Sequence, residues 1–472
     1  MDEYLNDVAK NCVNFFFVSH FMLMANILEC MHLPQTAPPL FNNNPFIAVW
    51  NAPTEFCQKN QIDLDMEIYT AVTSPAKVPG QPLTLFYANR LGEYPYINEL
   101  TKEKYYGGFP QEGHLKGHLA KASEDIQFYI PSAVTPGLAV IDWEEWRPIW
   151  SRNWGEKKVY ILHSITVMKK QKISWSMEEL FLTAERAFET AARKYMAETL
   201  ILGQEQRPYQ LWGFYLFPDC YNYDYKNANK PYTGKCSSTV MSQNDLLHWL
   251  WGNSSALYPS VYLSIVLKNS EKTALFVRNR VQEAKRVARL HGGLQIPPIY
   301  VYNRPVFTDL NSEFLSETDL IHTIGECAAL GVAGVILWGA SADYSIKRSC
   351  EELSKQLTQI LNPYIANVSA AAKLCSNLLC QGKGRCTRKN YDASDYLHLN
   401  AANFKIQKKR NGKYFAVGTA SPKDLSDMAN KFTCTCYVGE NCQAHLPAHI
   451  PNTQRVIPIY NSESERFNFK VD

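Results

Sequence analysis

The sequence predicts an α/β fold in which a closed (β/α) barrel is followed by a small disulfide-rich module. From Pro45 onward, short apolar runs rich in β-branched and aromatic residues alternate with amphipathic stretches, which is typical of parallel βα units buried on both faces. Six or more such units over about 320 residues favour a closed barrel over an open sheet. After Asn367 the apolar runs thin out, and cysteine, glycine and lysine become frequent.

Six apolar runs are the expected barrel strands. In chain order they are FIAVWN (46–51), LTLFY (83–87), GLAVIDWE (137–144), LWGFYLF (211–217), IPPIYVYNR (296–304) and GVAGVILWG (331–339).

Two amphipathic stretches are the clearest expected helices. One starts at Ser176, where S-M-E-E forms a capping box. The other starts near Ser316, has Asp319 three residues on, and runs through Ile324 to Leu330. In the first, apolar residues recur at helical spacing, namely Leu180, Phe181, Ala184, Phe188, Ala191 and Tyr195.

Four segments are expected along the chain. Residues 1–35 are interpreted as an atypical signal or leader, because the apolar run Val13–Leu28 contains polar residues and follows an acidic start. Residues 36–370 are the expected barrel. Residues 371–445 are the expected separate module, too small to hold a core without disulfides. Residues 446–472 are expected to be a flexible tail, whose polar end has no hydrophobic segment typical of a GPI signal.

Composition narrows the functional class. The net charge is only +3 over 472 residues, which gives no case for a nucleic-acid partner. Thirteen cysteines and two sequons, at Asn253 and Asn367, favour an oxidising secretory compartment and glycosylation. No other run reaches the roughly 18 apolar residues of a membrane span. Neither a zinc-type Cys/His spacing nor a glycine-rich phosphate loop is present, so no metal and no cofactor are expected.

The stretch GLAVIDWEEWRP (137–148) places acids at the end of a buried strand. Asp142 and Glu144 are two residues apart and share a face, with Cα atoms about 6.5–7 Å apart in a strand, whereas Glu145 faces the other way. The strand's carboxyl end opens into the cleft of a barrel, where two carboxylates flanked by tryptophans would suit a glycosidase. A solvated acidic turn neutralised by Arg147 is the alternative, and spacing alone leaves both open.

IDWEEWRP preceded by GLAV resembles the active-site signature of the hyaluronidases, glycoside hydrolase family 56. Further motifs similar to that family follow one another along nearly the whole chain: FIAVWNAPTEFC, LFYANRLGEYPY, GGFPQEGHLKGHL, LWGFYLFPDCYNY, WLWGNSSALYPSVY, VRNRVQEA, IGECAALGVAGVILWG and LNPYIANVSAAAKLCSNLLC. APTEFC, ALYPSVYL, VRNRVQEA and DYLHLNAANFKIQ bring the chain closest to the sperm-surface members.

The resemblance implies a distorted (β/α) TIM-like barrel with an EGF-like module behind it. It also implies endo-hydrolysis of the β-1,4 bond after N-acetylglucosamine in hyaluronan, with retention of the anomer. Glu144 matches the proton donor and Asp142 its partner carboxylate. The nucleophile implied is the N-acetyl oxygen of the substrate, an exception to the two-carboxylate scheme.

Other site residues follow from the same resemblance. Tyr215 and Tyr262 match tyrosines that hydrogen-bond the acetamido group, and Trp338 matches an aromatic wall of the sugar pocket. Arg280 and Tyr87 match substrate-side positions, and Asp219 matches a hydrogen-bonded site residue. Without the resemblance, Tyr215, Tyr262 and Trp338 would be interpreted as core residues. The segment R-N-R-V-Q-E around Arg280 would be interpreted as a solvent-exposed helix face.

The resemblance also implies five disulfides. They are Cys57–Cys350 across the barrel, Cys220–Cys236 in a loop, and Cys375–Cys386, Cys380–Cys434 and Cys436–Cys442 in the module. Cys12, Cys30 and Cys327 are left over, and Cys327 is expected to be a buried free thiol.

Three functions remain open on the sequence. The first is an active hyaluronidase, expected to be a monomer that acts outside the cell or on the sperm acrosome or surface. The second is a hyaluronan-binding or sperm–egg adhesion protein with little turnover, and the third is a chondroitin-preferring hydrolase. One departure from the family is ILHSITVMKK (161–170), an apolar patch where a polar, cationic helix is usual.

Overall fold

The computed structural model describes most of the chain, and the expected barrel and module fall almost entirely within it. The expected leader up to residue 34, with Cys12 and Cys30, lies outside the described residues, as does most of the expected tail. The described residues are 35–41, 44–73, 78–172, 174–227, 229–291, 295–410, 412–444 and 456–458.

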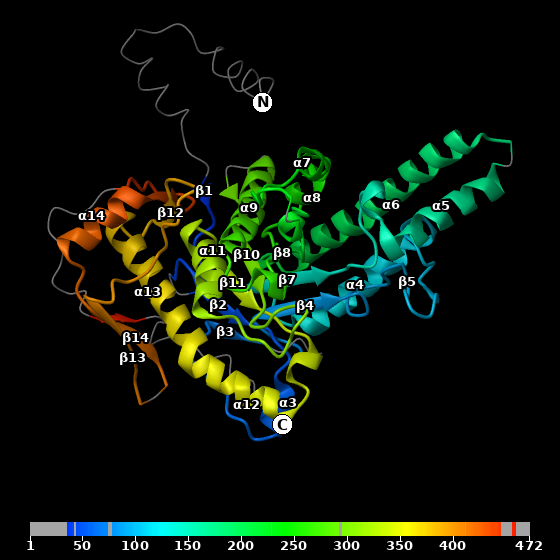
Figure 1. Cartoon of the computed structure of the whole chain (residues 1–472). Coiled ribbons are helices and arrows are strands. Elements are labelled where there is room, and N and C mark those ends of the chain that lie inside the picture. Colours follow the sequence, from blue (N-terminus) through cyan, green and yellow to red (C-terminus); the bar gives the residue numbers. More distant parts are fainter. Residues whose placement is uncertain are drawn as a thin grey trace, which may run out of the picture.

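Two parallel sheets, ordered β10–β11–β2–β3 and β4–β7–β8, form the walls of the barrel (Figure 1). The residues around Tyr258 join them on one side, because Tyr258 bridges to Tyr215 after β8 and Ser260 bridges to Tyr302 of β10, both in parallel. The strands are β2 (Ile47–Trp50), β3 (Ala71–Val72), β4 (Leu83–Tyr87), β7 (Gly137–Asp142), β8 (Gln210–Phe214), β10 (Tyr300–Asn303) and β11 (Gly334–Leu337).

On the opposite side of the ring, a side-chain hydrogen bond connects the end of β3 to β4. The Thr73 hydroxyl, directly after β3, donates a hydrogen bond of 2.9 Å to the carbonyl of Leu83 in β4. The described part of the connection between these strands contains no helix. The barrel predicted from the sequence is therefore present, and this seam is where its regular βα repeat is lost.

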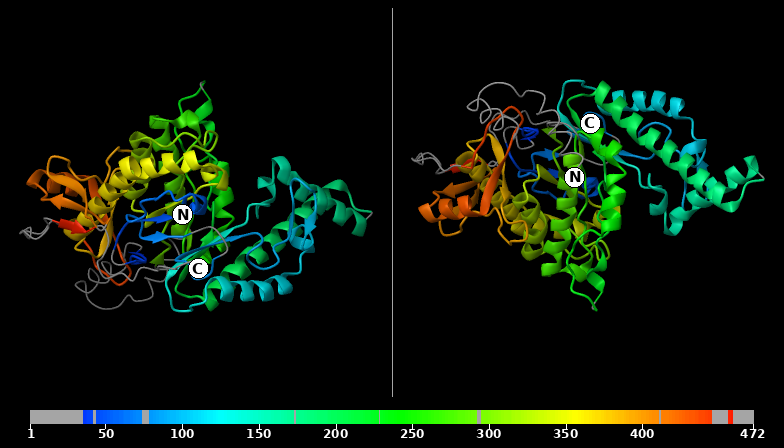
Figure 2. Two further views of the ribbon diagram at one scale, coloured as in Figure 1. Left: turned by 90° about the horizontal axis from the view of Figure 1, so that it is seen from below. Right: turned by 90° about the horizontal axis from the view of Figure 1, so that it is seen from above.

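Helices surround the ring and link most of the successive strands. They are α3 (Glu55–Lys59), α4 (Leu115–Tyr129), α5 (Lys158–Gln171), α6 (Met177–Gln206), α7 (Ser238–Asp245), α8 (His248–Gly252), α9 (Glu271–Ala288), α10 (Glu317–Leu320), α11 (Glu326–Ala329), α12 (Lys347–Gln356) and α13 (Asn362–Leu379). The α5–α6 hairpin projects as an arm from the barrel in all three ribbon views (Figures 1 and 2). Across the described residues, none of these helices combines the length and apolarity that crossing a bilayer demands.

The predicted capping box at Ser176 is confirmed, and the predicted helix start near Ser316 carries one as well. Ser176 accepts from the Glu179 N–H at 3.2 Å, and the Glu179 carboxylate accepts from the Ser176 N–H at 2.8 Å. Ser316 and Asp319 repeat the arrangement at α10. The second helix continues to α11 through a π-helical turn at Ile321–Gly325, so helical hydrogen bonding extends close to the predicted end at Leu330.

Side chains alternate between the barrel interior and the surrounding helices. On β7, Leu138 and Val140 belong to the inner core, whereas Ala139 and Ile141 pack in the outer core against the helices. This parity directs Asp142, the next residue of the inner set, into the barrel at the carboxyl end of the strand.

The described residues after α13 form two small antiparallel sheets and one helix. Strand β12 (Gly384–Arg388) pairs with β15 (Phe432–Cys436), and β14 (Tyr414–Gly418) lies between β13 (Phe404–Lys408) and β16 (Val456–Pro458). Helix α14 (Pro422–Lys431) precedes β15. Residues 456–458 of the expected flexible tail are thus part of a sheet.

Five disulfides link the described cysteines, and they are the same five pairs that the resemblance implies. Cys327 is the free cysteine among these residues, and it is buried. The pairs are Cys57–Cys350, Cys220–Cys236, Cys375–Cys386, Cys380–Cys434 and Cys436–Cys442.

The barrel and the C-terminal region share structure across the expected boundary at 370/371, which falls inside α13. Glu326 of α11 is fully buried and pairs with Arg278 of α9 at 2.7 Å and with Arg388 of β12. Arg385 of β12 donates to the carbonyls of Pro45 and Ala37 near the start of the barrel. The two parts are therefore joined by a continuous helix and by buried polar contacts.

Candidate active site

Several predicted site residues meet at the carboxyl ends of the barrel strands. Tyr87 ends β4 and is the register partner of Asp142, which ends β7. Tyr215, Tyr262 and Trp338 follow β8, the bridging segment around Tyr258 and β11, and all three pack against the inner core of the barrel. Their arrangement follows from strand parity, because each lies an even number of residues from an inward-facing residue of its own segment.

The two carboxyl groups sit in different surroundings. The Asp142 side chain reaches into the barrel mouth, and its Oδ1 is buried without a hydrogen-bond partner. Glu144 is open to solvent, and its backbone carbonyl accepts a hydrogen bond of 3.1 Å from Nη1 of Arg147. One carboxyl is therefore enclosed, while the other remains accessible to a ligand.

Both carboxyl groups hold protons more tightly than usual. Burial raises the pKa of Asp142 well above its ordinary range, and the charges of Glu144 and Glu145 raise it further. Desolvation by the surrounding protein also raises the pKa of Glu144, although the charges of Arg147 and Lys157 oppose this. Two neighbouring carboxyl groups of this kind do not both ionise readily, so the pair retains a proton that it can donate.

Aromatic side chains form one wall beside Asp142. The rings of Tyr262 and Trp338 stack with centroids 5.7 Å apart and planes 14° apart, and Tyr215 lies 6.2 Å from Tyr262. The indole N–H of Trp338 donates to the Tyr87 hydroxyl at 3.3 Å. Burial raises the pKa of both Tyr215 and Tyr262 well above 10, which keeps these phenols protonated as hydrogen-bond donors.

Arg280 does not occupy a substrate-exposed position, and neither is it the solvated cation that its local sequence suggests. It is only 2% exposed and pairs with Asp219 at 3.0 Å. It also donates to the Asn222 side chain and to the Ser260 carbonyl, each at 3.0 Å. Its role in the structure is to anchor the loop that follows β8.

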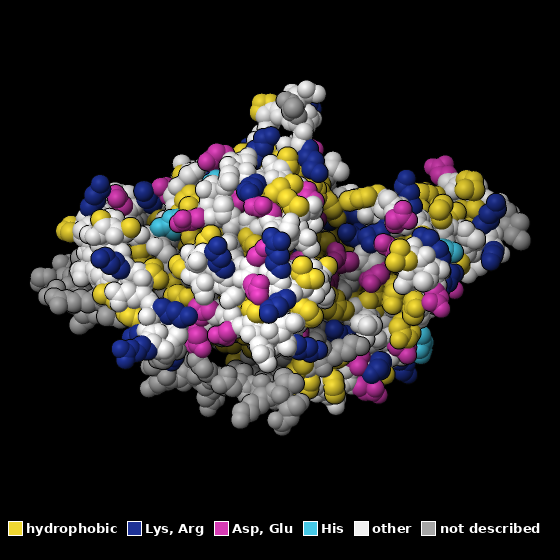
Figure 3. Space-filling model, turned by 60° about the horizontal axis from the view of Figure 1, so that its bottom comes forward, with side chains coloured by type: hydrophobic (Ala, Val, Ile, Leu, Met, Phe, Trp, Pro, Cys, Tyr) yellow, Lys and Arg dark blue, Asp and Glu magenta, His cyan; other side chains and the backbone are white. Residues whose placement is uncertain are grey.

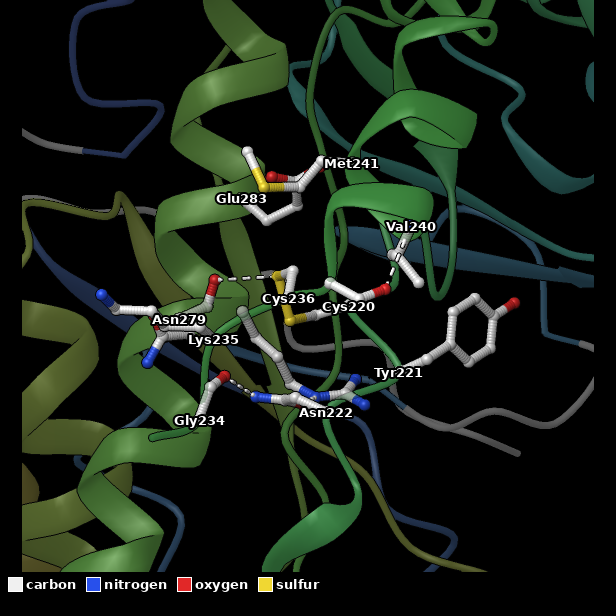
Figure 4. Close-up of a disulfide and its surroundings, with 12 residues drawn as sticks. Cys220, Tyr221, Asn222, Gly234, Lys235, Cys236, Val240, Met241, Asn279 and Glu283 are labelled. Atoms are coloured by element: carbon white, nitrogen blue, oxygen red, sulfur yellow. Dashed lines mark hydrogen bonds between the residues drawn. A yellow bond between two sulfur atoms is a disulfide. The ribbon is translucent and has the colours of Figure 1, made fainter. Parts of the chain in front are cut away.

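The same loop is fixed by Asp219 and by a disulfide. The Asp219 carboxylate accepts from the backbone N–H groups of Cys220 and Tyr221 at 2.7 and 3.0 Å. Cys220 is bonded to Cys236, and the ring of Tyr221 points away from this disulfide (Figure 4). Asp219 is thus a buried support of the loop.

Two tryptophans next to the acids in sequence, Trp143 and Trp146, lie in the outer core on the helix side of the strand. Trp143 and Trp146 are buried and pack on Tyr94, with ring centroids 4.4 and 5.2 Å away. The Glu145 carboxylate accepts the backbone N–H of Glu144 at 3.1 Å. Trp143 and Trp146 therefore support the strand end from the outer side, whereas Asp142 faces the barrel interior.

Two inward-facing polar residues were missed by sequence reasoning. Asn51 follows β2, is fully buried, and has no hydrogen-bond partner for its side-chain amide. Tyr302 of β10 stands edge-on to Tyr215 at 5.0 Å, and its hydroxyl likewise has no partner. Both residues lie near the ends of the runs FIAVWN and IPPIYVYNR, and this position was the sequence feature that could have indicated them.

A hollow separates the body of the molecule from the projecting arm, and acidic and basic side chains line it (Figure 3). Among the described residues, no three His, Cys, Asp or Glu side chains are grouped so that they could hold a metal ion.

The sequon asparagines lie elsewhere. Asn367 is on α13 at the edge of a cavity of about 350 Å³, and its Oδ1 accepts the Leu399 N–H at 3.0 Å. Asn253 follows α8 and donates to the Trp249 carbonyl at 2.6 Å.

Comparison with known proteins gives consistent matches. A family model described as hyaluronidase matches residues 35–446. Hyaluronidase-5 of Mus musculus is 48% identical over 426 residues, which are 90% of this chain and 80% of that protein. Hyaluronidase PH-20 of Homo sapiens is 45% identical over 416 residues, 88% of this chain and 81% of that protein.

Two solved structures of bee venom hyaluronidase are similar. One aligns with a TM-score of 0.59 and 31% identity, covering 68% of this chain and 99% of the other. The second, in complex with a hyaluronic acid tetramer, aligns with a TM-score of 0.60 and 30% identity, covering 68% and 98%.

Proposed function

The chain belongs to the hyaluronidase family, glycoside hydrolase family 56, and on that premise we propose that it hydrolyses the β-1,4 bonds between N-acetylglucosamine and glucuronate in hyaluronan. The observation that carries the proposal is the pairing of an enclosed Asp142 with an accessible Glu144 at the barrel mouth. The pKa of each carboxyl group is raised, which supports a pair that holds a proton for donation.

In the first step Glu144 is the general acid. The carbonyl oxygen of the substrate's N-acetyl group attacks the anomeric carbon, and the bond to the leaving oxygen breaks as that oxygen takes the Glu144 proton. The product on the enzyme is a cyclic oxazolinium ion. Asp142 orients the acetamido group and stabilises the positive charge that develops on the ring.

In the second step Glu144 is the general base. It removes a proton from water as the water oxygen attacks the anomeric carbon from the face that the leaving group vacated. The bond to the acetamido oxygen breaks, the N-acetyl group is restored, and two inversions give net retention. This substrate assistance replaces the covalent carboxylate intermediate of ordinary retaining enzymes.

Neighbouring residues position the sugar. Tyr215 and Tyr262 would donate hydrogen bonds to the acetamido group, which their high pKa values permit across the physiological range. Trp338, stacked on Tyr262, would cover one face of the sugar, and Tyr87 would hold the indole. For Arg280 and Asp219 we propose indirect roles, because both are buried in an ion pair with each other.

Replacement of Glu144 tests the proposal. Glu144→Gln removes the transferable proton with little change of shape, so cleavage of hyaluronan should be abolished while binding is retained. Glu178→Gln is the control, since this exposed glutamate lies in the first turn of α6 on the projecting arm and should leave the activity unchanged. Undiminished cleavage by the Glu144 variant would refute its assignment as the acid.

Two other functions are outcomes of the same assay. Parent protein that binds hyaluronan without shortening it would indicate the binding or adhesion function. Faster cleavage of chondroitin than of hyaluronan would indicate a chondroitin-preferring hydrolase. A zymogram from pH 4 to 8 with both polymers side by side distinguishes these outcomes from an active hyaluronidase.

We further propose that the C-terminal region is EGF-like and that Asn253 and Asn367 are glycosylated. The five disulfides support folding in the secretory pathway and action outside the cell or on the sperm surface. Monomeric behaviour is proposed as well. Mass spectrometry before and after glycosidase treatment, and light scattering, test these proposals.

A further inference from the structure

An exposed tryptophan lies near the candidate acid and has no part in the mechanism described above. Trp154 is 50% exposed and precedes the short 3-10 turn Gly155–Lys157. Its ring meets the ring of Tyr221 edge-on, with centroids 4.9 Å apart. The guanidinium of Arg152 lies over the Tyr221 ring at 5.2 Å. A large apolar surface is therefore held in a defined orientation and left open to solvent.

The loop that presents Tyr221 is held in a conformation that most residues avoid. Tyr221 has a φ of 49°, in the left-handed region that bulky residues rarely adopt. The Asp219 carboxylate, its ion pair with Arg280 and the Cys220–Cys236 disulfide hold the backbone there. Such strain persists where surrounding structure imposes it, and it clusters at functional sites.

Arg147 connects this aromatic pair to Glu144. Its Nη1 donates to the Glu144 carbonyl at 3.1 Å, and its guanidinium interacts with the Tyr221 hydroxyl. Asn153, directly before Trp154, accepts from the Arg147 N–H at 2.9 Å and donates to the Arg147 carbonyl at 3.0 Å. Trp154 is thus fixed to the segment that carries the proton donor.

The aromatic pair is linked to the segment of Glu144, and Trp338 is linked to Asp142. Trp338 reaches Asp142 through Tyr87, its register partner, whereas Trp154 and Tyr221 reach Glu144 through Arg147. A general acid lies beside the oxygen that it protonates, and that oxygen leaves with the sugar beyond the cleaved bond. The surface next to Glu144 therefore suits the leaving part of the polymer.

We infer that Trp154 and Tyr221 form an aromatic wall that binds the sugar on the leaving-group side of the cleaved bond. The C–H face of a pyranose packs on an aromatic ring, and a rigid, half-exposed tryptophan supplies this contact at low conformational cost. The inference rests on the proposed function and adds a binding surface, linked to Glu144 through Arg147, to the sugar pocket that contains Trp338.

The test compares three variants on hyaluronan polymer. Trp154→Ala should raise KM about tenfold with a smaller change in kcat, because truncating an aromatic contact costs about 1.4 kcal/mol of binding. Trp154→Phe should restore most of the parent KM. Trp175→Ala is the control, since Trp175 is also exposed (36%) but lies at the tip of the α5–α6 arm. Thermal melting of each variant checks that folding is intact.

Binding is measured separately from turnover. In a Glu144→Gln background, Trp154→Ala should weaken the affinity for hyaluronan by a similar factor. An active parent whose KM, kcat and affinity are all unchanged by Trp154→Ala would overturn the wall and leave the proposed function standing. A parent protein that neither cleaves nor binds hyaluronan would refute both the proposed function and the aromatic wall. If Trp175→Ala raised KM as much as Trp154→Ala does, only the aromatic wall would be refuted.

Discussion

His118 of α4 should make the protein less stable in acid. It is fully buried, its Nε2 lies 2.8 Å from the Thr199 hydroxyl, and its ring meets Trp143 edge-on at 5.4 Å. Desolvation lowers its pKa from 6.5 to about 4. The folded protein therefore keeps this imidazole neutral at pH values where the unfolded chain protonates it.

The size of the effect follows from linkage. Because the unfolded state binds more protons between pH 6.5 and 4, the free energy of unfolding falls as the pH falls through this window and levels off below it. With the two pKa values above, His118 alone lowers the free energy of unfolding by about 2 kcal/mol at pH 5 and about 3 kcal/mol at pH 4, relative to pH 8.

Urea unfolding at several pH values measures the contribution of His118 to the pH dependence of the unfolding free energy. His118→Gln removes the titrating group, so the decrease in unfolding free energy between pH 7 and 4.5 should become shallower by about 2 kcal/mol. Gln127→Ala, on the exposed face of the same helix, changes no titrating group and should leave the slope unchanged. Equal slopes in the parent and in His118→Gln would refute the reasoning.

Three further predictions concern stability. Glu326→Gln should lower the free energy of unfolding by about 3–5 kcal/mol in denaturant titration, because two buried arginines lose their counter-charge, whereas the exposed Glu317→Gln should be nearly neutral. Replacing both Cys57 and Cys350 by Ala should cost about 3–5 kcal/mol and lower the Tm, since their bond closes a loop of 293 residues; an unchanged Tm would contradict this. Ser176→Ala should cost about 1 kcal/mol by loss of the capping box, visible as a small decrease in the denaturation midpoint.

The strands were predictable where they are long enough to show an apolar run. All six runs contain barrel strands, because both faces of a parallel barrel strand are buried. The segment around Tyr258 was missed, since Pro259 interrupts it and its pairing consists of isolated bridges. The two-residue β3 carries too little pattern to be recognised.

The position of Asp142 in the site was predictable from the sequence, whereas those of Arg280 and Trp154 were not. Strand parity alone places Asp142 inside the barrel. The local helix sequence could not predict the burial of Arg280, because its partners Asp219 and Asn222 come from a loop about sixty residues earlier. For the same reason, sequence spacing could not bring Trp154 together with Tyr221.

The chain's first described strand restricts how this protein can be recombined with its relatives. Strand β1 (Gln35–Thr36) pairs with β9 (Gln295–Ile296), which directly precedes β10 of the barrel, and Thr36 also bridges to Tyr437 in the C-terminal region. The Thr36 hydroxyl and the Ala37 carbonyl accept from Arg385. A chimera that exchanged residues 371–445 alone would place a foreign surface against β1 and cut α13 in two. A workable graft would carry its own residues 35–45 and its own α13, so the inherited unit is larger than the cysteine-rich segment.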